Sequence, residues 1–141
     1  MSGTTVDRGL AERLASVQLR VAHAAEAAGR DASEVTIIGV TKTVGRDAVD
    51  EAYRLGMRVF GENRVQDARV KFATQLPDDA ELHMIGSLQS NKAKVAAELF
   101  DVIQSVDRAS LVEALARQAD SSGRSIDILL EISVAGEEQK A

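Results

Sequence analysis

Polar residues follow four apolar segments of the chain, each time at the point where the segment ends. The four runs are Val40-Thr41-Lys42-Thr43, Phe60-Gly61-Glu62-Asn63, His83-Met84-Ile85-Gly86-Ser87 and Ser105-Val106-Asp107. Lysine amines attack aldehydes, amide and imidazole groups hydrogen-bond ring substituents, and hydroxyl and backbone N–H groups hold anions. The runs therefore predict a site for a small polar ligand, provided that the fold brings them to one place.

Lys42 has the most specific chemistry of these residues. It directly follows an apolar segment, so we expect the stem of its side chain to be partly removed from water. An amine in that setting can attack an aldehyde and form a Schiff base. The alternative is a lysine whose stem lies along the strand end while its amine reaches solvent. The position of Lys42 alone leaves both interpretations open.

Other polar residues in these runs could orient a ligand. Asn63 and His83 could hydrogen-bond ring substituents, and Ser87 with Ser90 could hold an anion at a helix start. Each has a simpler role as well. Asn63 and Ser90 could cap the helices that follow them, and His83 could be a hydrogen-bonded core histidine. The only other histidine, His23, lies in the first helical segment, so we expect no histidine metal cluster.

The elements that must position these residues alternate regularly. A helix is predicted over residues 6–28, where apolar residues recur every three or four positions. Strands are predicted over short β-branched segments at residues 35–41, 57–60, 82–85, 102–106 and 126–134. Helices are predicted between them at residues 47–55, 64–76, 91–99 and 108–121. This order predicts an α/β fold with a parallel sheet and right-handed crossovers.

Two arrangements of the parallel sheet are possible: an open doubly wound sheet, or part of a (β/α) barrel. No Gly-x-Gly-x-x-Gly follows the first strand, which removes the main support for a dinucleotide-binding fold. In both arrangements, functional residues gather at the C-terminal ends of the strands. We therefore expect Lys42 and the other three runs to meet at one rim of a single domain over residues 1–141.

Composition narrows the class of protein. The chain has 141 residues, a net charge of −5 and no cysteine. An acidic chain lacks the basic excess of proteins that bind nucleic acid or membrane surfaces, so neither partner is expected. The absence of cysteine excludes thiolate metal sites and cysteine nucleophiles. With no leader sequence or membrane-spanning segment visible, a cytoplasmic location is expected.

The runs extend into longer motifs that resemble one family, the pyridoxal phosphate homeostasis proteins. Its bacterial members are called YggS-like, and its human member is the proline synthase co-transcribed protein. The motifs are VTKT at 40–43, FGENRVQD at 60–67, HMIGSLQSNK at 83–92, SVD at 105–107 and ISVAGEEQK at 132–140. They occur in order and at matching spacing, so the resemblance covers the chain from about residue 6 onward.

The resemblance implies the N-terminal portion of an alanine-racemase-like (β/α) barrel with a leading helix. It also implies that Lys42 carries pyridoxal 5'-phosphate as a Schiff base. The residues Asn63, His83, Gly86 and Ser87 match site-lining positions of the same motifs, to which Gly61, Glu62, Gln66 and Asn91 also belong. Members are regarded as proteins that bind, buffer or deliver the cofactor in vitamin B6 homeostasis, without established catalysis.

The chain departs from this family in length. Members continue for several further βα units, which supply the phosphate cradle and an arginine that faces the pyridine nitrogen. The resemblance therefore implies either a missing C-terminal half of the barrel or a homo-oligomer in which two copies complement each other. Two other functions stay open: a pyridoxal phosphate-dependent amino-acid enzyme of racemase or decarboxylase type, and a cofactor-free fragment that associates through open sheet edges.

Overall fold

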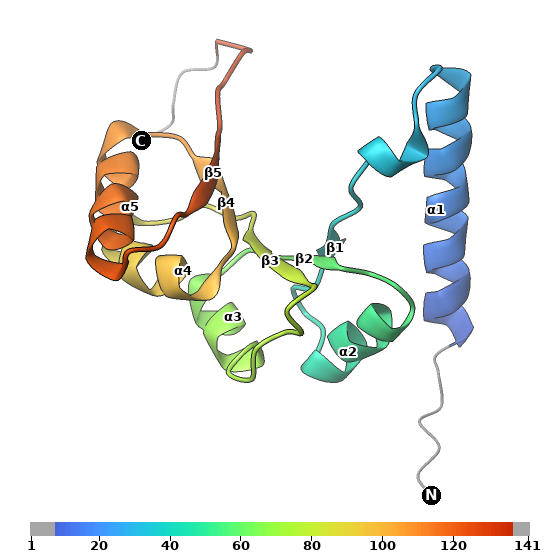
Figure 1. Ribbon diagram of the computed structural model, residues 1–141, viewed down its shortest axis with the longest axis horizontal. Helices are drawn as coiled ribbons and strands as arrows, with labels where there is room; N and C mark the ends of the chain where they lie inside the picture. The colour runs from blue at the N-terminus through green and yellow to red at the C-terminus, as the bar shows by residue number, and fades with distance from the viewer. Residues whose placement is uncertain (1–7, 137–141) are drawn as a thin grey trace, which may run out of the picture.

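Five parallel strands form one curved sheet in the computed structural model, which describes residues 8–136 (Figure 1). They are β1 (Gly39–Val40), β2 (Val59–Glu62), β3 (Glu81–Met84), β4 (Val102–Val106) and β5 (Asp127–Leu130). The strand order is β1-β2-β3-β4-β5, and every neighbouring pair is parallel. A doubly wound sheet would reverse its order at a switch point. The sequential order therefore identifies the wall of a (β/α) barrel.

Helices connect the strands along one face of the sheet. Helix α1 (Arg8–Ala27) and the short 3-10 helix η1 (Ala32–Glu34) precede β1. The crossovers contain α2 (Arg46–Arg54), α3 (Val65–Lys71), η2 (Ser90–Lys92) with α4 (Ala93–Leu99), and α5 (Ala109–Ser122). In Figure 1, α2 and α3 lie below the arc of strands, α4 and α5 lie at its left side, and α1 stands beyond β1. The concave side of the arc has no described helix across it.

The hydrophobic core lies between the sheet and helices α2 to α5. Its largest fully buried apolar side chains are Phe60, Phe100, Met84, Leu88, Ile103, Leu111, Val49 and Val106. Phe60 and Leu82 are register partners on β2 and β3, and both belong to this core. Because successive strand residues point to opposite faces, their neighbours Gly61 and His83, also register partners, belong to the concave face.

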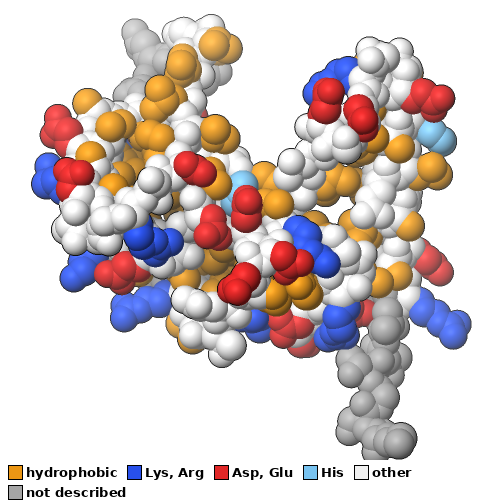
Figure 2. All heavy atoms as spheres, viewed as in Figure 1, with side chains coloured by type: hydrophobic (Ala, Val, Ile, Leu, Met, Phe, Trp, Pro, Cys, Tyr) orange, Lys and Arg blue, Asp and Glu red, His pale blue; other side chains and the backbone are white. Residues whose placement is uncertain are grey.

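Both outer strands carry apolar side chains that the described residues leave exposed. Val40 on β1 is 50% exposed, Leu130 on β5 is 64% exposed, and Val134 beyond β5 is 95% exposed. Figure 2 shows hydrophobic side chains along the segment after β5, at the edge of the hollow that faces α1. Within residues 8–136, β1 and β5 each pair with one strand, so each leaves an edge of backbone groups open to pairing.

Two elements are shorter than the sequence pattern predicts. The predicted strand at 35–41 is confirmed only at Gly39–Val40, because just these residues have register partners on β2. The helix predicted over 64–76 ends at Lys71 as α3. The Arg46 guanidinium donates to the backbone carbonyls of Lys71, Thr74 and Gln75. These carbonyls therefore have partners outside a helix, and the chain leaves the helical path early.

Other predicted boundaries agree more closely with the structure. The strand at 102–106 is β4, with the same ends, and α1 begins at Arg8, within the predicted range. Ser90 does not cap α4, because the N-cap residue is Lys92 and no side chain caps this helix. The hydroxyl of Ser90 instead accepts a 3.4 Å hydrogen bond from Arg108. The predicted start at residue 6 lies outside the described residues.

A polar cluster ties α2 to the loop before β3, at the N-terminal ends of the strands. Tyr53 Oη donates a 2.6 Å hydrogen bond to Asp79 Oδ1, and Arg58 Nε lies 2.9 Å from Asp79 Oδ2. The Arg58 guanidinium also lies 4.2 Å from the centre of the Tyr53 ring. The hydrogen bond from Tyr53, helped by the charge of Arg58, lowers the pKa of Asp79 below its ordinary value.

We expect Tyr53→Phe to raise the pKa of Asp79 toward its ordinary value of 3.8, because the carboxylate loses its closest donor. With the wild-type pKa lowered, Asp79 stabilises the fold above its unfolded-state pKa, and this stabilisation is lost as pH falls through the folded-state pKa. NMR titration of side-chain carboxyls would measure the shift. Asp31, whose pKa is lowered by Ser33, is the internal control, and an unchanged Asp79 pKa would contradict the prediction.

Candidate functional site

The C-terminal ends of the first four strands are joined in a row along one rim. The Thr41 N–H after β1 donates to the Gly61 carbonyl of β2 at 3.0 Å. The Ile85 N–H after β3 donates to the Glu62 carbonyl at 2.9 Å. The Ser105 hydroxyl of β4 donates to the Gly86 carbonyl at 2.5 Å. The four runs singled out in the sequence therefore meet at one rim, as parallel strands require.

Lys42 lies at this rim with its side chain exposed. This exposure favours the alternative interpretation, in which the Lys42 amine reaches solvent. The chain turns directly after Thr41, whose carbonyl accepts a 3.3 Å hydrogen bond from the Val44 N–H, and no described segment covers the concave face there. Within residues 8–136, the Lys42 amine makes no hydrogen bond or ion pair. It is therefore available to react with a ligand.

Asn63 and Gly86 are in direct backbone contact across the ends of β2 and β3. A Cβ atom at position 86 would lie 2.2 Å from the Asn63 carbonyl oxygen, so glycine is required there. Gly86 therefore allows the two strand ends to approach each other. Asn63 is half-buried and does not cap α3, whose N-cap residue is Arg64 without a side-chain hydrogen bond.

A cavity of about 540 Å³ lies between the start of α3 and the segment that follows β3. Its lining residues are Asn63, Arg64, Val65, Gln66, Asp67, Met84, Ser87, Leu88, Gln89 and Lys92. Two of the residues predicted from sequence, Asn63 and Ser87, thus line one cavity. Lys42 and His83 lie outside its lining. The cavity offers amide, hydroxyl, cationic and carboxylate groups at the C-terminal ends of β2 and β3.

His83 is buried on the concave face, and both of its ring nitrogens have partners. Nε2 lies 2.9 Å from Glu81 Oε2, and Nδ1 lies 2.9 Å from the Gln104 side-chain nitrogen. Because the Gln104 amide nitrogen can only donate, Nδ1 is the acceptor and Nε2–H donates to Glu81. The geometry favours the hydrogen-bonded core histidine over a residue free to bind a ligand.

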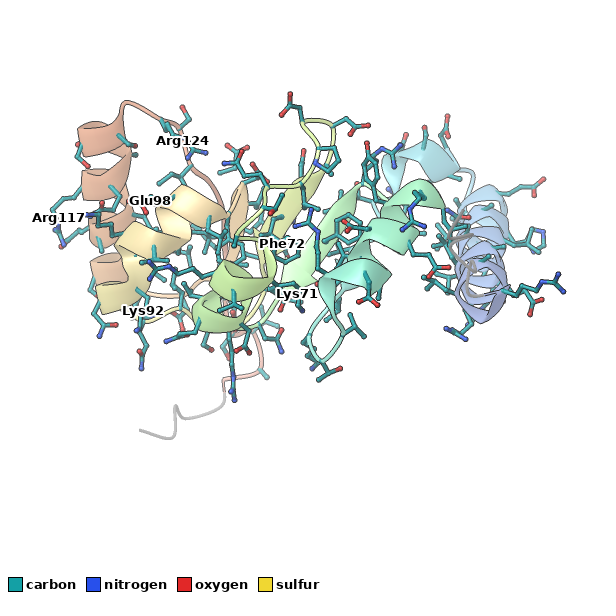
Figure 3. All side chains as sticks on the ribbon, turned by 90° about the horizontal axis from the view of Figure 1, so that it is seen from below. Lys71, Phe72, Lys92, Glu98, Arg117 and Arg124 are labelled. Carbon is teal, nitrogen blue, oxygen red and sulfur yellow. The ribbon has the colours of Figure 1, made fainter. Side chains whose placement is uncertain are left out.

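The sequence analysis missed Lys71, which reaches the rim from the end of α3. Its amine lies 2.5 Å from Glu62 Oε1 and donates to the Thr41 carbonyl at 2.6 Å. Figure 3 shows Lys71 toward the middle of the molecule, away from Lys92 and Arg117 near α4 and α5. A usable signal was Glu62, an acidic residue at the end of a buried strand, because a buried carboxylate needs a cationic partner.

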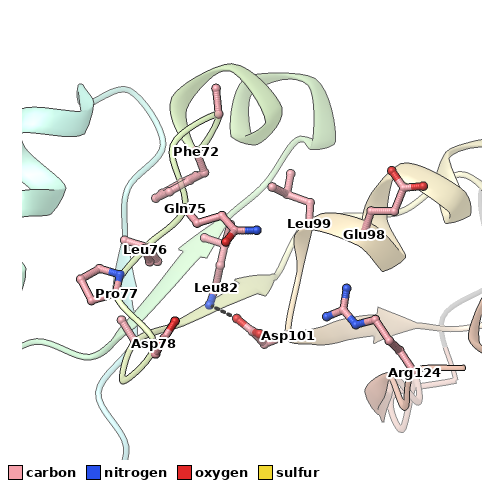
Figure 4. Close-up of a pocket in the computed structure, with 12 residues that line it drawn as sticks. Phe72, Gln75, Leu76, Pro77, Asp78, Leu82, Glu98, Leu99, Asp101 and Arg124 are labelled. Carbon is pink, nitrogen blue, oxygen red and sulfur yellow. Dashed lines mark hydrogen bonds between the residues drawn. The ribbon is translucent and has the colours of Figure 1, made fainter. Parts of the chain in front are cut away.

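A second cavity, of about 340 Å³, lies at the opposite end of the strands (Figure 4). Glu98 and Arg124 lie on one side of it, and Leu76 and Pro77 lie on the other. Within it, Asp101 Oδ2 accepts a 2.7 Å hydrogen bond from the Leu82 N–H. Barrel folds of this kind place their chemistry at the C-terminal strand ends, so this cavity is not the candidate site.

No group of three or more histidine, aspartate or glutamate side chains within residues 8–136 is arranged to hold a metal ion. No helix in the same range is long and apolar enough to cross a bilayer.

Comparisons with known proteins give relatives that cover most of this chain. The pyridoxal phosphate homeostasis protein of Pseudomonas aeruginosa is 39% identical over 132 residues, or 94% of the chain. The protein of the same name from Aquifex aeolicus is 38% identical over 129 residues, or 92% of the chain. The chain spans 57% of the length of each. No protein-family model matches.

Solved structures agree with these relatives. PipY of Synechococcus elongatus, without PLP, is 43% identical with a TM-score of 0.77, over 93% of this chain and 57% of PipY. The chain belongs to the pyridoxal phosphate homeostasis protein family. PipY with PLP bound matches with 41% identity and a TM-score of 0.73, over 90% of this chain and 56% of PipY. An unknown protein from Bifidobacterium adolescentis matches with 31% identity and a TM-score of 0.87, over 100% of this chain and 61% of that protein's chain.

These matches confirm the family and the fold class expected from the sequence. The parallel sheet with its leading helix corresponds to the N-terminal portion of the barrel of the pyridoxal phosphate homeostasis proteins. None of the matches assigns a role to an individual residue of this chain. The roles of Lys42, Asn63, His83, Gly86 and Ser87 toward a cofactor therefore stay predictions.

Proposed function

We propose that this chain binds pyridoxal 5'-phosphate and takes part in vitamin B6 homeostasis, with Lys42 forming a Schiff base to the cofactor. The observation that carries the proposal is the exposed Lys42 just after β1, whose amine has no hydrogen-bond or ion-pair partner within residues 8–136. The names of the relatives and the PLP-bound form of PipY support the choice of cofactor. The proposed role is binding and release, without a catalysed reaction on another substrate.

The described residues fit the aldehyde end of such a cofactor. The bound cofactor supplies an aldehyde and an electron-withdrawing ring. Lys42 contributes the nitrogen that bonds to the aldehyde carbon with loss of one water molecule. Asn63 and Ser87, which line the cavity at the ends of β2 and β3, would offer an amide and a hydroxyl to ring substituents. A carrier must also release its cofactor to water or to another amine, and the exposure of Lys42 suits that exchange.

Two alternatives are less well supported. A racemase needs a second acid–base group across the ring from the lysine, but the only tyrosine, Tyr53, bonds Asp79 at the N-terminal ends of the strands. A cofactor-free fragment would associate through the open edges at β1 and β5 and would need no reactive lysine. The labelling experiment below separates this alternative from the carrier function.

We expect Lys42→Ala to abolish covalent labelling by the cofactor. The purified chain would be mixed with pyridoxal 5'-phosphate, reduced with borohydride and mapped by peptide mass spectrometry, because reduction makes the bond to the lysine permanent. The wild type should carry one dominant adduct at Lys42. Lys94→Ala is the matched control, since Lys94 is an exposed lysine on α4 and its removal should leave the adduct unchanged. Labelling spread evenly over surface lysines would contradict the proposal.

A further inference from the structure

An ion pair buried between α3 and the ends of β1 and β2 lies beside the reactive lysine. The side chain of Glu62 is 1% exposed, and that of Lys71 is 12% exposed. The Lys71 amine contacts Glu62 Oε1 at 2.5 Å and the Thr41 carbonyl at 2.6 Å. The Thr41 hydroxyl donates to the same Glu62 oxygen at 2.7 Å. Both ends of Thr41, its carbonyl and its side chain, are thus held by one pair of charges.

Stability alone is a weak explanation for this ion pair. Moving two charges out of water costs free energy that their attraction only partly returns, so apolar side chains of similar size often stabilise a fold as well. Buried pairs of this kind can instead select one geometry among several. The geometry to consider here is that of Thr41, because its carbonyl belongs to the peptide group that leads into Lys42.

The segment that carries Lys42 is a tight turn with a strained residue. The Val44 N–H donates to the Thr41 carbonyl, so Lys42 and Thr43 are the two central residues of a four-residue turn. Thr43 has a φ of 71°, and it is the one described non-glycine residue with a positive φ. A β-branched residue adopts this conformation only when its surroundings enforce it. Contacts from outside the turn must therefore stabilise it. Lys71 supplies such a contact by donating a hydrogen bond to the Thr41 carbonyl.

We propose that Glu62 and Lys71 are positioning residues for Lys42. They hold Thr41 against β2 and so fix the turn from which the Lys42 amine extends over the rim. The role of the pair also explains why one of two neighbouring lysines is reactive. The Lys71 amine is bound to two oxygens, whereas the Lys42 amine has no partner among the described residues. This inference rests on the proposed function of Lys42, but its effect on the turn can be measured without any cofactor.

The test uses the double variant Glu62→Gln/Lys71→Met, which removes both charges and leaves no unpaired buried ion. In the absence of cofactor, we expect hydrogen exchange of the Val44 amide to become faster, because Thr41 is no longer held. With pyridoxal 5'-phosphate and borohydride, we expect the rate of labelling at Lys42 to fall about tenfold, as misplaced reacting groups do. The single variant Lys71→Arg keeps the positive charge, so its rate of Lys42 labelling should stay close to that of the wild type.

A control separates positioning from general loss of stability. Leu115→Ala removes a buried side chain from α5, where Leu115 is 3% exposed, and should destabilise the fold without changing Val44 exchange or Lys42 labelling at a temperature where both proteins are folded. If the double variant showed the wild-type rates of Val44 amide exchange and Lys42 labelling, the inference would be overturned. Absence of Lys42 labelling in the wild type would instead overturn the proposed function, and the exchange measurement would still decide whether the pair holds the turn.

Discussion

Phe60→Ala is expected to lower the free energy of unfolding by about 3–5 kcal/mol, the usual cost of replacing a buried phenylalanine by alanine. Phe60 lies on β2 with no exposed surface, and it belongs to the core that joins the sheet to helices α2 to α5. The neighbouring backbone is held in the parallel ladder, so the surroundings can close only part of the cavity. Urea unfolding followed by circular dichroism would measure the change.

Val70→Ala provides the comparison for this prediction. Val70 lies on α3, close to Phe60 in sequence, but it is 80% exposed. Its replacement should change the free energy of unfolding by less than about 0.5 kcal/mol, as for most surface positions. If both variants lost similar stability, the core assigned to this face of the sheet would be wrong.

The order and type of the elements could be predicted because burial leaves a pattern in the sequence. Strands covered by helices read as short β-branched runs, and β4 matches its predicted range of 102–106 at both ends. The ends of other elements depend on distant partners. The strand β1 is two residues long because only those residues pair with β2. Helix α3 stops where Arg46, from another helix, binds the carbonyls that follow it.

The candidate site was predictable to a similar extent. The position of Lys42 at the rim follows from parallel strand topology, which places all C-terminal strand ends together. Lys71 could not be found this way, because its amine meets the Thr41 carbonyl across 30 residues of sequence. Exposure of Lys42 was also outside the reach of sequence patterns, since it depends on which segments cover the concave face.

Gly86 shows how a correctly chosen residue can have a different role from the one expected. The sequence analysis selected it as a residue that lines the site. In the structure, its missing side chain lets the Asn63 carbonyl lie where a Cβ atom would be. Glycine here sets the distance between two strand ends, and through Ser105, which donates to the Gly86 carbonyl, it also affects the end of β4.

Gly86→Ala is therefore expected to destabilise the fold by about 1–3 kcal/mol and to reduce Lys42 labelling by displacing the Asn63 segment. The matched control is Gly61→Ala on the adjacent strand. A Cβ there would lie 3.1 Å from methyl groups of the Ile38 and Ile85 side chains, which need to move by only a few tenths of an ångström. Neither glycine has a positive φ, so backbone conformation does not separate the two variants.

The two variants would be compared by urea unfolding and by labelling with pyridoxal 5'-phosphate and borohydride. At position 86 the added Cβ clashes with the Asn63 backbone, so β2 and β3 must separate at the rim to remove the clash. At position 61 the rotation of neighbouring side chains is enough. We therefore expect the larger loss of both stability and labelling in Gly86→Ala. If Gly61→Ala proved equally damaging, close approach of the Asn63 backbone would not be the reason for glycine at position 86.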